Sequence, residues 1–282
     1  MCAMGPRTCG TVVVVNGSRL VRSLDLPEVH TYLLDALTEM CGLLAEAGID
    51  CWLDGGTLLG VVREGGFIPW DDDADICVLR RDLPAALRVL EEGLSEAYRL
   101  NTEPGPTVNA TVEIRALRGD FVSVVAEQLQ PVSVDVVAMD WVAGSGWLRA
   151  LSLRPTRELA WRHDRRVPTP DGGVRGLLAA TLRRLPDKAV VSVQRGVIWL
   201  NRRLTRREYF TYALDTAASR PLYPRDAVLP VAPLLMAGRQ FHGPADPVAY
   251  LRALFGPDFM TPQPSVAHTR QCWLVLTDSA ER

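Results

Sequence analysis

The segment Trp70–Leu79 (WDDDADICVL) constrains this chain most, because it joins a run of aspartates to an apolar stretch. The stretch from Ile76 onward is typical of a buried strand. In a strand over 71–79, alternation would place Asp71, Asp73 and Asp75 on one face. Like charges at the edge of a core cost several kcal/mol unless a cation neutralises them. The segment therefore predicts either a divalent-metal site or an ordinary solvated acidic turn.

A second acidic position, Asp135, lies inside the apolar run 131–139 (PVSVDVVAM). A lone aspartate in such a strand needs a partner. We expect either a metal ion shared with Asp73 and Asp75 on a neighbouring strand or an ion pair with an arginine. Carboxylate oxygens without nearby His or Cys favour Mg²⁺ or Mn²⁺ over zinc. Asp140, where the run ends, is a weaker candidate.

A glycine-rich segment, 54–60 (DGGTLLG), follows an expected strand at 49–53 and precedes an apolar helix. Gly55 and Gly56 permit close backbone approach, and Thr57 can place its hydroxyl and N–H at a helix N-terminus, as phosphate-binding loops do. Elsewhere such a sequence is often a simple turn. Its position shortly before the acidic segment favours phosphate binding.

The remaining pattern predicts a mixed α/β sheet with helices packed on it. Capping residues and turn signals mark most of the boundaries. The tail from Pro257 is expected to be irregular. The expected elements are a strand pair over 11–22 that turns at Asn16-Gly17, a helix from Asp25 to Gly48, a helix from Asp82, strands over 107–117, 121–126 and 131–138, and a last helix from Asp246 to Gly256.

Residues 154–207 differ from the rest, because arginines far outnumber acids there. Helices are expected over 174–185 and 187–204, with a third starting at Thr205. Their apolar runs indicate one buried and one basic face. The basic face either offsets the acidic remainder, guides an anionic donor or acceptor, or rests on an anionic membrane surface.

Composition bears on the partners of the protein, on its cellular compartment and on the state of its cysteines. The formal net charge is -2, so no global basic field indicates nucleic-acid binding. The apolar run 11–15 is too short for a secretory signal, and no stretch is long enough to span a membrane, so a cytoplasmic protein is expected. The cysteines show neither a CxxC pair nor zinc spacing and are expected to be reduced thiols. They are Cys2, Cys9, Cys41, Cys51, Cys77 and Cys272.

The segment Trp52–Arg63 (WLDGGTLLGVVR), followed by Gly65–Ile76 (GGFIPWDDDADI), resembles the signature of the LicD family. That family includes bacterial phosphocholine transferases and the animal fukutin-related protein. Ser133–Val136 is similar to its second acidic strand. The resemblance covers about 28–142 and 220–265, whereas 145–218 matches no motif of the family. Its closing segment is similar to Gly238–Phe241, Asp246-Pro247, Tyr250-Leu251, Phe255–Met260 and Pro262.

The resemblance implies a nucleotidyltransferase-like fold. We expect a single catalytic domain, 1–282, with an arginine-rich helical insertion over about 145–218. The resemblance implies Asp73, Asp75 and Asp135 as ligands of Mg²⁺ or Mn²⁺, with two ions. It also implies transfer of a phospho-alcohol, such as phosphocholine or ribitol phosphate, from a CDP-linked donor to a hydroxyl of a glycan or small molecule, with release of CMP. Nucleic acid is not an expected partner.

Roles follow for further residues. Asp135 is the expected base, and Gly55, Gly56 and Thr57 are expected to hold the donor phosphates. Arg63 is the first choice for neutralising phosphate charge, before Arg115 and Arg239, although each arginine can equally be a surface residue. The rival functions are nucleotidyl transfer to a small-molecule hydroxyl, with release of pyrophosphate, and a catalytically silent nucleotide-binding module.

Two positions depart from the family pattern. Glu64 stands where the family usually has a basic residue, and Ala74 stands where it usually has a bulky aliphatic one. Neither departure removes an expected metal ligand. Glu64 puts in question whether the chain uses the family's usual donor or acceptor.

Overall fold

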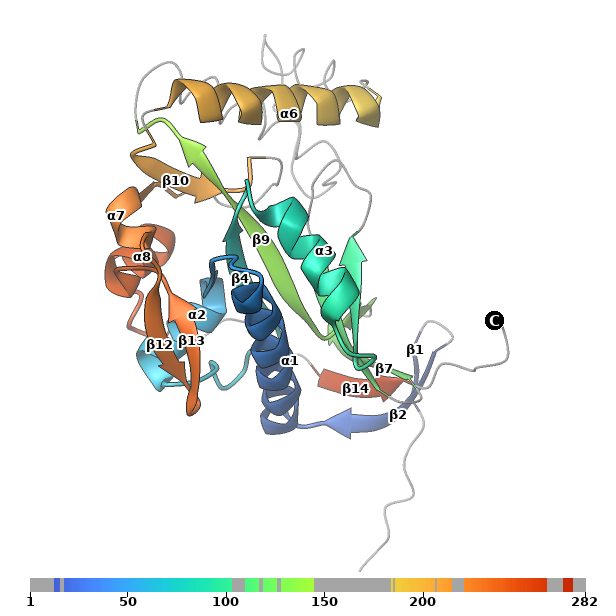
Figure 1. Cartoon of the computed structure of the whole chain (residues 1–282). Helices are drawn as coiled ribbons and strands as arrows, with labels where there is room; N and C mark the ends of the chain where they lie inside the picture. The colour runs from blue at the N-terminus through green and yellow to red at the C-terminus, as the bar shows by residue number, and fades with distance from the viewer. Residues whose placement is uncertain are drawn as a thin grey trace, which may run out of the picture.

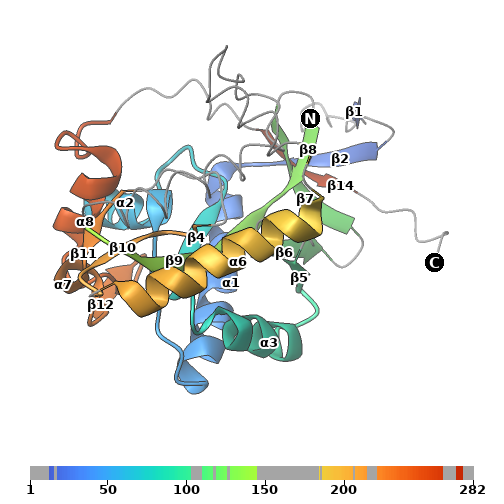
Figure 2. The same cartoon turned by 90° about the horizontal axis from the view of Figure 1, so that it is seen from above.

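The computed structural model describes residues 13–15, 18–102, 110–116, 119–125, 128–144, 184, 186–205, 207–214, 221–262 and 271–275. A mixed twelve-stranded sheet forms the framework. Helices α1 and α3 pack side by side on one face of it, and α6 lies across the end at which β9 terminates (Figures 1 and 2). The helices are α1 (Leu26–Glu46), α2 (Gly55–Glu64), α3 (Leu83–Gly93), α6 (Asp187–Leu204), α7 (Arg225–Val228) and α8 (Pro247–Phe255).

Strand β9 (Ser133–Val142) is the centre of the sheet. It pairs in parallel with β4 (Ala74–Leu79) and antiparallel with β6 and β10. Both central strands are apolar because both of their faces are covered. The other strands of the sheet are β1 (Val13–Val15), β2 (Ser18–Leu24), β3 (Cys51–Leu53), β5 (Tyr98–Thr102), β6 (Ala110–Ala116), β7 (Gly119–Val125), β8 (Gln128–Pro131), β10 (Tyr209–Tyr212), β11 (Tyr223–Pro224) and β14 (Gln271–Val275).

The mixed α/β fold class and several element boundaries are confirmed. Helix α1 begins after Asp25, whose carboxylate accepts a hydrogen bond from the Glu28 amide at 2.9 Å. Helix α8 begins after Asp246, whose carboxylate accepts from the Ala249 amide, and it ends at Gly256 with φ +92°. Helix α6 occupies 187–204 as expected.

Three predictions were wrong. The acidic strand begins at Ala74 rather than Asp71, so the first aspartates lie in the preceding loop. The third helix expected at Thr205 is absent from the described residues: α6 ends there and β10 starts at Tyr209, because Tyr-Phe-Thr-Tyr suits pairing with the end of β9. The tail is not wholly irregular, since residues 271–275 pair with β2 and β7. The helix expected over 174–185 lies almost wholly outside the described residues.

Three further features of the described residues bear on the site or on the sequence predictions. A hairpin of β12 (Ala232–Met236) and β13 (Arg239–Gly243), not expected from the sequence, packs near α1 and β3. Cys41, Cys51, Cys77 and Cys272 are free thiols. None of the helices in the described part of the chain combines the length and apolar character that a bilayer crossing requires.

Candidate active site

The parallel pairing of β4 with β9 joins the two acidic segments of the sequence. Asp75 lies directly beside Asp135 in the register of the two strands. Residues paired across neighbouring strands point to the same face, so the two carboxylates share one side of the sheet. The expectation that Asp135 and Asp75 occupy neighbouring strands is therefore confirmed.

The loop before β4 gathers the remaining aspartates. Asp71, Asp72 and Asp73 each offer one carboxylate oxygen, and these oxygens lie within 4.8 Å of one another. The loop is held by His30 of α1, whose Nε2 lies 2.8 Å from the carbonyl oxygen of Asp71. Cys272 of β14 donates a long hydrogen bond to Asp72. Strand alternation would have separated consecutive acids, whereas the loop brings them together.

The start of α2 faces these carboxylates. Gly55 has φ +53°, and a Cβ atom there would lie 2.6 Å from Oδ2 of Asp75. A Cβ atom at Gly56 would lie 2.8 Å from Oδ2 of Asp71. The helix N-terminus has unpaired N–H groups and a positive dipole end, which favour nearby negative charge. A side chain at either position would displace the carboxylate that approaches the backbone there.

Thr57 connects α2 to the central strand. Its hydroxyl accepts a hydrogen bond of 2.9 Å from the backbone N–H of Asp75, and the residue is 1% exposed. The sequence predicted a phosphate contact for Thr57. In the structure this hydroxyl faces inward and fixes the position of Asp75.

The carboxylates repel one another strongly. Burial raises the pKa of Asp75 well above its usual range, and the neighbouring charges of Asp54, Asp73, Asp135 and Asp71 raise it further. Burial, with the charge of Asp73, raises the pKa of Asp135 to about 6. Such a set of crowded carboxylates fits a divalent cation, which would supply the missing positive charge.

Asp54, which the sequence analysis did not single out, is the buried N-cap of α2. Tyr212 and Tyr250 donate hydrogen bonds to its Oδ1 at 2.8 and 2.7 Å, and Cys77 donates to its Oδ2 at 3.0 Å. Burial raises the pKa of Asp54, while these three donors oppose the rise. Asp54 thereby joins β4, β10 and α8 beneath the site. The sequence signal that could have identified Asp54 is its position directly between an expected strand and Gly55-Gly56.

Removing either donor hydroxyl should destabilise the protein. We expect Tyr212→Phe and Tyr250→Phe each to lower the free energy of unfolding by about 1.5–3 kcal/mol, because a hydrogen bond to a buried charge is lost. Each change raises the pKa of Asp54 further, so the loss should be larger at pH 8 than at pH 5. Urea unfolding at the two pH values measures it.

Tyr223→Phe is the matched control for this prediction. Its ring stacks on that of Tyr250, with 4.1 Å between the ring centroids, but its hydroxyl is not among the three donors to Asp54. It should therefore cost little. A loss as large as that of Tyr250→Phe would show that the hydroxyls act on packing rather than on Asp54.

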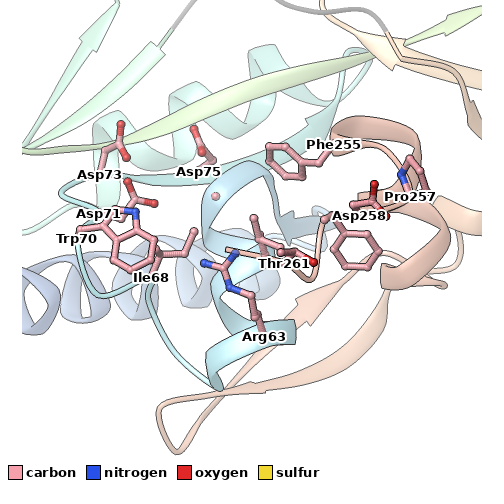
Figure 3. A pocket seen from close by; sticks show the side chains of 13 residues that line it. Arg63, Ile68, Trp70, Asp71, Asp73, Asp75, Phe255, Pro257, Asp258 and Thr261 are labelled. Atoms are coloured by element: carbon pink, nitrogen blue, oxygen red, sulfur yellow. The ribbon is translucent and has the colours of Figure 1, made fainter. Parts of the chain in front are cut away.

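A cavity of about 520 Å³ opens beside the acids. Figure 3 shows Asp71, Asp73 and Asp75 on one side of it and Phe255, Pro257 and Asp258 across from them. Trp70 and Phe259 add aromatic surface. The cavity is thus lined by carboxylates, an arginine and aromatic rings, and its aromatic wall was not identified from the sequence because it comes from distant segments.

Arg63 is the predicted phosphate-binding arginine that lines this cavity (Figure 3). Its guanidinium lies 6.0 Å from the ring centroid of Trp70, and its Nε donates to Glu64 at 2.8 Å. Glu64, the departure from the family pattern, therefore orients Arg63 and offsets part of its charge.

Three other sequence candidates lie elsewhere. Arg239 does not line the cavity, because its guanidinium donates to Asp35 at 2.7 Å and to Thr38 at 2.8 Å on α1. Arg115 lies on β6 and is likewise not among the described residues that line the cavity. Asp140, the weaker acidic candidate, is bound by Arg80 and accepts from the amide of Leu214. Arg239 and Asp140 thus connect elements of the fold.

Residues 48–164 match the family model described as LicD/FKTN/FKRP, nucleotidyltransferase domain. Residues 48–164 are a LicD-family domain. This domain includes β3, α2, β4 and β9, and with them the acids at 71–75 and 135. The family recognised from the sequence motifs is therefore confirmed for this part of the chain.

Two curated relatives share this domain. Ribitol 5-phosphate transferase FKRP of Homo sapiens is 35% identical over 97 residues, which are 34% of this chain and 18% of the relative. Lipopolysaccharide cholinephosphotransferase LicD of Haemophilus influenzae is 34% identical over 82 residues, which are 29% of this chain and 31% of the relative. The chain thus spans about a fifth of the first and about a third of the second. The names of both are those of transferases.

Two solved structures show some likeness to the chain. Terminal uridylyl transferase 4 from Trypanosoma brucei with bound GTP matches with TM-score 0.25 and 21% identity, over 49% of this chain and 40% of that one. The antibiotic-resistance factor ANT(2'')-Ia matches with TM-score 0.25 and 14% identity, over 61% of this chain and 93% of that one.

Proposed function

We propose that this protein is a metal-dependent phosphotransferase that moves a phospho-alcohol group from a CDP-linked donor to a hydroxyl of a glycan or small-molecule acceptor. The observation that supports it most is the register of β4 and β9, which sets Asp75 beside Asp135 next to a cavity lined by Arg63. The relatives' names, a ribitol-phosphate and a phosphocholine transferase, indicate the class of group transferred.

Asp73, Asp75 and Asp135 would hold Mg²⁺ or Mn²⁺, with two ions sharing the three carboxylates, and Asp71 stands close enough to assist. When bound, such ions supply Lewis-acid activation and charge stabilisation for phosphoryl transfer. The start of α2 keeps Asp75 and Asp71 in place through Gly55 and Gly56. Thr57 helps to fix the position of Asp75, because its hydroxyl accepts a hydrogen bond from the backbone N–H of Asp75.

The transfer itself needs one bond made and one broken. The acceptor oxygen forms a bond to the phosphorus that carries the alcohol, and the bond from that phosphorus to the bridging oxygen breaks, so CMP leaves with that oxygen. The acceptor proton passes to Asp135, whose carboxylate lies beside Asp75 in the register of β4 and β9. Arg63 faces the phosphates and offsets the charge of the leaving group. We propose that the catalytic unit comprises about 28–142 and 220–265, with 145–218 as an insertion in the same domain.

Nucleotide consumption tests the proposal directly. With a panel of CDP-alcohols, CTP and ATP, we expect metal-dependent release of CMP from a CDP-alcohol, stopped by EDTA and restored by excess Mg²⁺. The product nucleotide is measured by anion-exchange chromatography. CDP-choline and CDP-ribitol are the first donors to compare.

Each rival function predicts a different product. Pyrophosphate from CTP or ATP, with no turnover of CDP-alcohols, would replace the proposal with nucleotidyl transfer. Binding of nucleotides without consumption of any donor, in the presence of both metals and a range of hydroxyl acceptors, would favour a silent binding module. The full set of acids at 73, 75 and 135 is the observation against that module.

A further inference from the structure

Helix α6 presents a basic and aromatic face to the outside. Lys188, Ser192, Arg195, Trp199 and Arg203 recur at spacings of four, three, four and four, which places them on one side of the helix, and all five are exposed. We call these residues the outer face of α6. Figures 1 and 2 show the helix at the end of the molecule where β9 terminates, away from α1.

One large aromatic side chain is exposed on this face: Trp199 is 55% exposed. Val193 and Leu204, which are 44% and 50% exposed, lie roughly 120–140° round the helix from Trp199 and do not belong to the outer face. The guanidinium of Arg203 lies over the indole of Trp199, 4.6 Å from the ring centroid. Asn201, on the opposite side, is buried where the helix contacts β9. An indole and cations on one exposed helix side are typical of side chains at a membrane interface.

The charge of this region is mostly of one sign. Asp187 at the start of α6 is followed by only basic charged residues up to Arg207, although the whole chain has a formal net charge of -2. Just beyond α6, Arg207 lines a pocket of about 180 Å³ together with Arg80, Arg81 and Asp140, where β4 ends, and Asp140 pairs with Arg80. The positive charge is therefore concentrated at one end of an otherwise acidic protein, and it complements an anionic surface.

We propose that the outer face of α6 docks on an anionic phospholipid bilayer. Trp199 lies at the level of the headgroups, and the side chains of Lys188, Arg195 and Arg203 contact lipid phosphates. A bilayer fits better than nucleic acid, because an exposed indole with cations beside it matches the headgroup level, where Trp is enriched and Lys and Arg meet phosphates. This docking does not depend on the proposed chemistry, since α6 contributes no residue to the described cavity.

Vesicle flotation with the full chain tests this docking. We expect binding to phosphatidylcholine vesicles that contain about a third phosphatidylglycerol, and little binding to phosphatidylcholine alone. The Arg195→Glu/Arg203→Glu variant should bind at least tenfold more weakly, and Trp199→Ala several-fold more weakly. Binding should also fall steeply toward 1 M salt, where the screening length is only about 3 Å.

Matched control variants separate docking by α6 from the effects of net charge and of exposed apolar surface elsewhere on the protein. Arg88→Glu/Arg225→Glu changes the net charge equally through exposed arginines elsewhere, and Leu235→Ala removes a side chain that is 62% exposed on β12. Both should bind vesicles like the wild type. Equal weakening by the control variants, no preference for anionic vesicles, or binding to a single-stranded RNA oligonucleotide without binding to vesicles would overturn the proposal. CMP release from soluble substrates should stay unchanged in the α6 variants, so the outcome is separate from that of the proposed function.

Discussion

Asp73→Asn, Asp75→Asn and Asp135→Asn should each lower metal-dependent CMP release by roughly 100-fold or more, which is about 2.7 kcal/mol of transition-state stabilisation. Each change removes one ligand charge while keeping the shape of the side chain. Initial rates at saturating CDP-alcohol and Mg²⁺ measure the effect. Circular dichroism checks that the fold is retained.

Asp140→Asn is the control, because it makes the same chemical change on the same strand at a carboxylate that already has a cationic partner. Asp140 is bound by Arg80, so its loss should reduce stability without a comparable loss of turnover per folded molecule. Near-normal turnover in any of the three site variants would remove that residue from the proposed site.

The same cluster gives a stability prediction for the metal-free protein. The pKa of Asp75 is raised in the folded state, so its protonated form favours folding, and this contribution is lost as pH rises from about 4 through the raised value. Asparagine does not titrate. In EDTA at pH 8, Asp75→Asn should therefore be more stable than the wild type by about 1 kcal/mol or more, and the difference should shrink toward pH 4. Thermal unfolding across this range measures it.

Gly55→Ala should also abolish most activity. The new methyl group would lie 2.6 Å from Asp75 Oδ2, so the carboxylate must move away from its position beside Asp135. We expect a loss of about 100-fold in CMP release. The positive φ of +53° adds a strain of roughly 1–2 kcal/mol to the folded state.

Two further alanines separate strain from collision. Gly65, at the end of α2, has φ +76° and nothing within 4 Å of an added Cβ, so Gly65→Ala should lose stability but keep activity within a few-fold. Gly56 has no positive φ, but an added Cβ would lie 2.8 Å from Asp71 Oδ2. Gly56→Ala should therefore lose activity with less strain. If Gly55→Ala is as active as Gly65→Ala, the close approach to Asp75 has no functional role.

Local sequence patterns predicted the elements that depend on neighbouring residues. Asp25 and Asp246 mark helix starts because a side-chain carboxylate accepts an amide three residues ahead, a contact within one turn. The bounds of α6 followed from periodicity for the same reason. Strand β14 was missed because its pairing with β2 and β7 comes from distant segments.

The chemical character of the site was also readable from the sequence. Acids at 71–75 and 135 in apolar surroundings indicated a cation, since unpaired buried carboxylates are too costly otherwise. Gly-Gly before a helix indicated a close approach of other atoms to the backbone. Sequence reasoning assigned that approach to phosphate, whereas the structure places the carboxylates of Asp75 and Asp71 there.

Only the tertiary structure decided which of these groups meet. The parallel register places Asp75 beside Asp135, the Asp54 network joins three elements beneath them, and Phe255 of α8 completes the cavity. The same packing places Arg239 on α1 rather than in the cavity. Residue type and local periodicity determine which elements form and which side chains need a partner. Contacts between residues far apart in the chain determine which partner each one finds, and a single sequence carries no periodic signal for them.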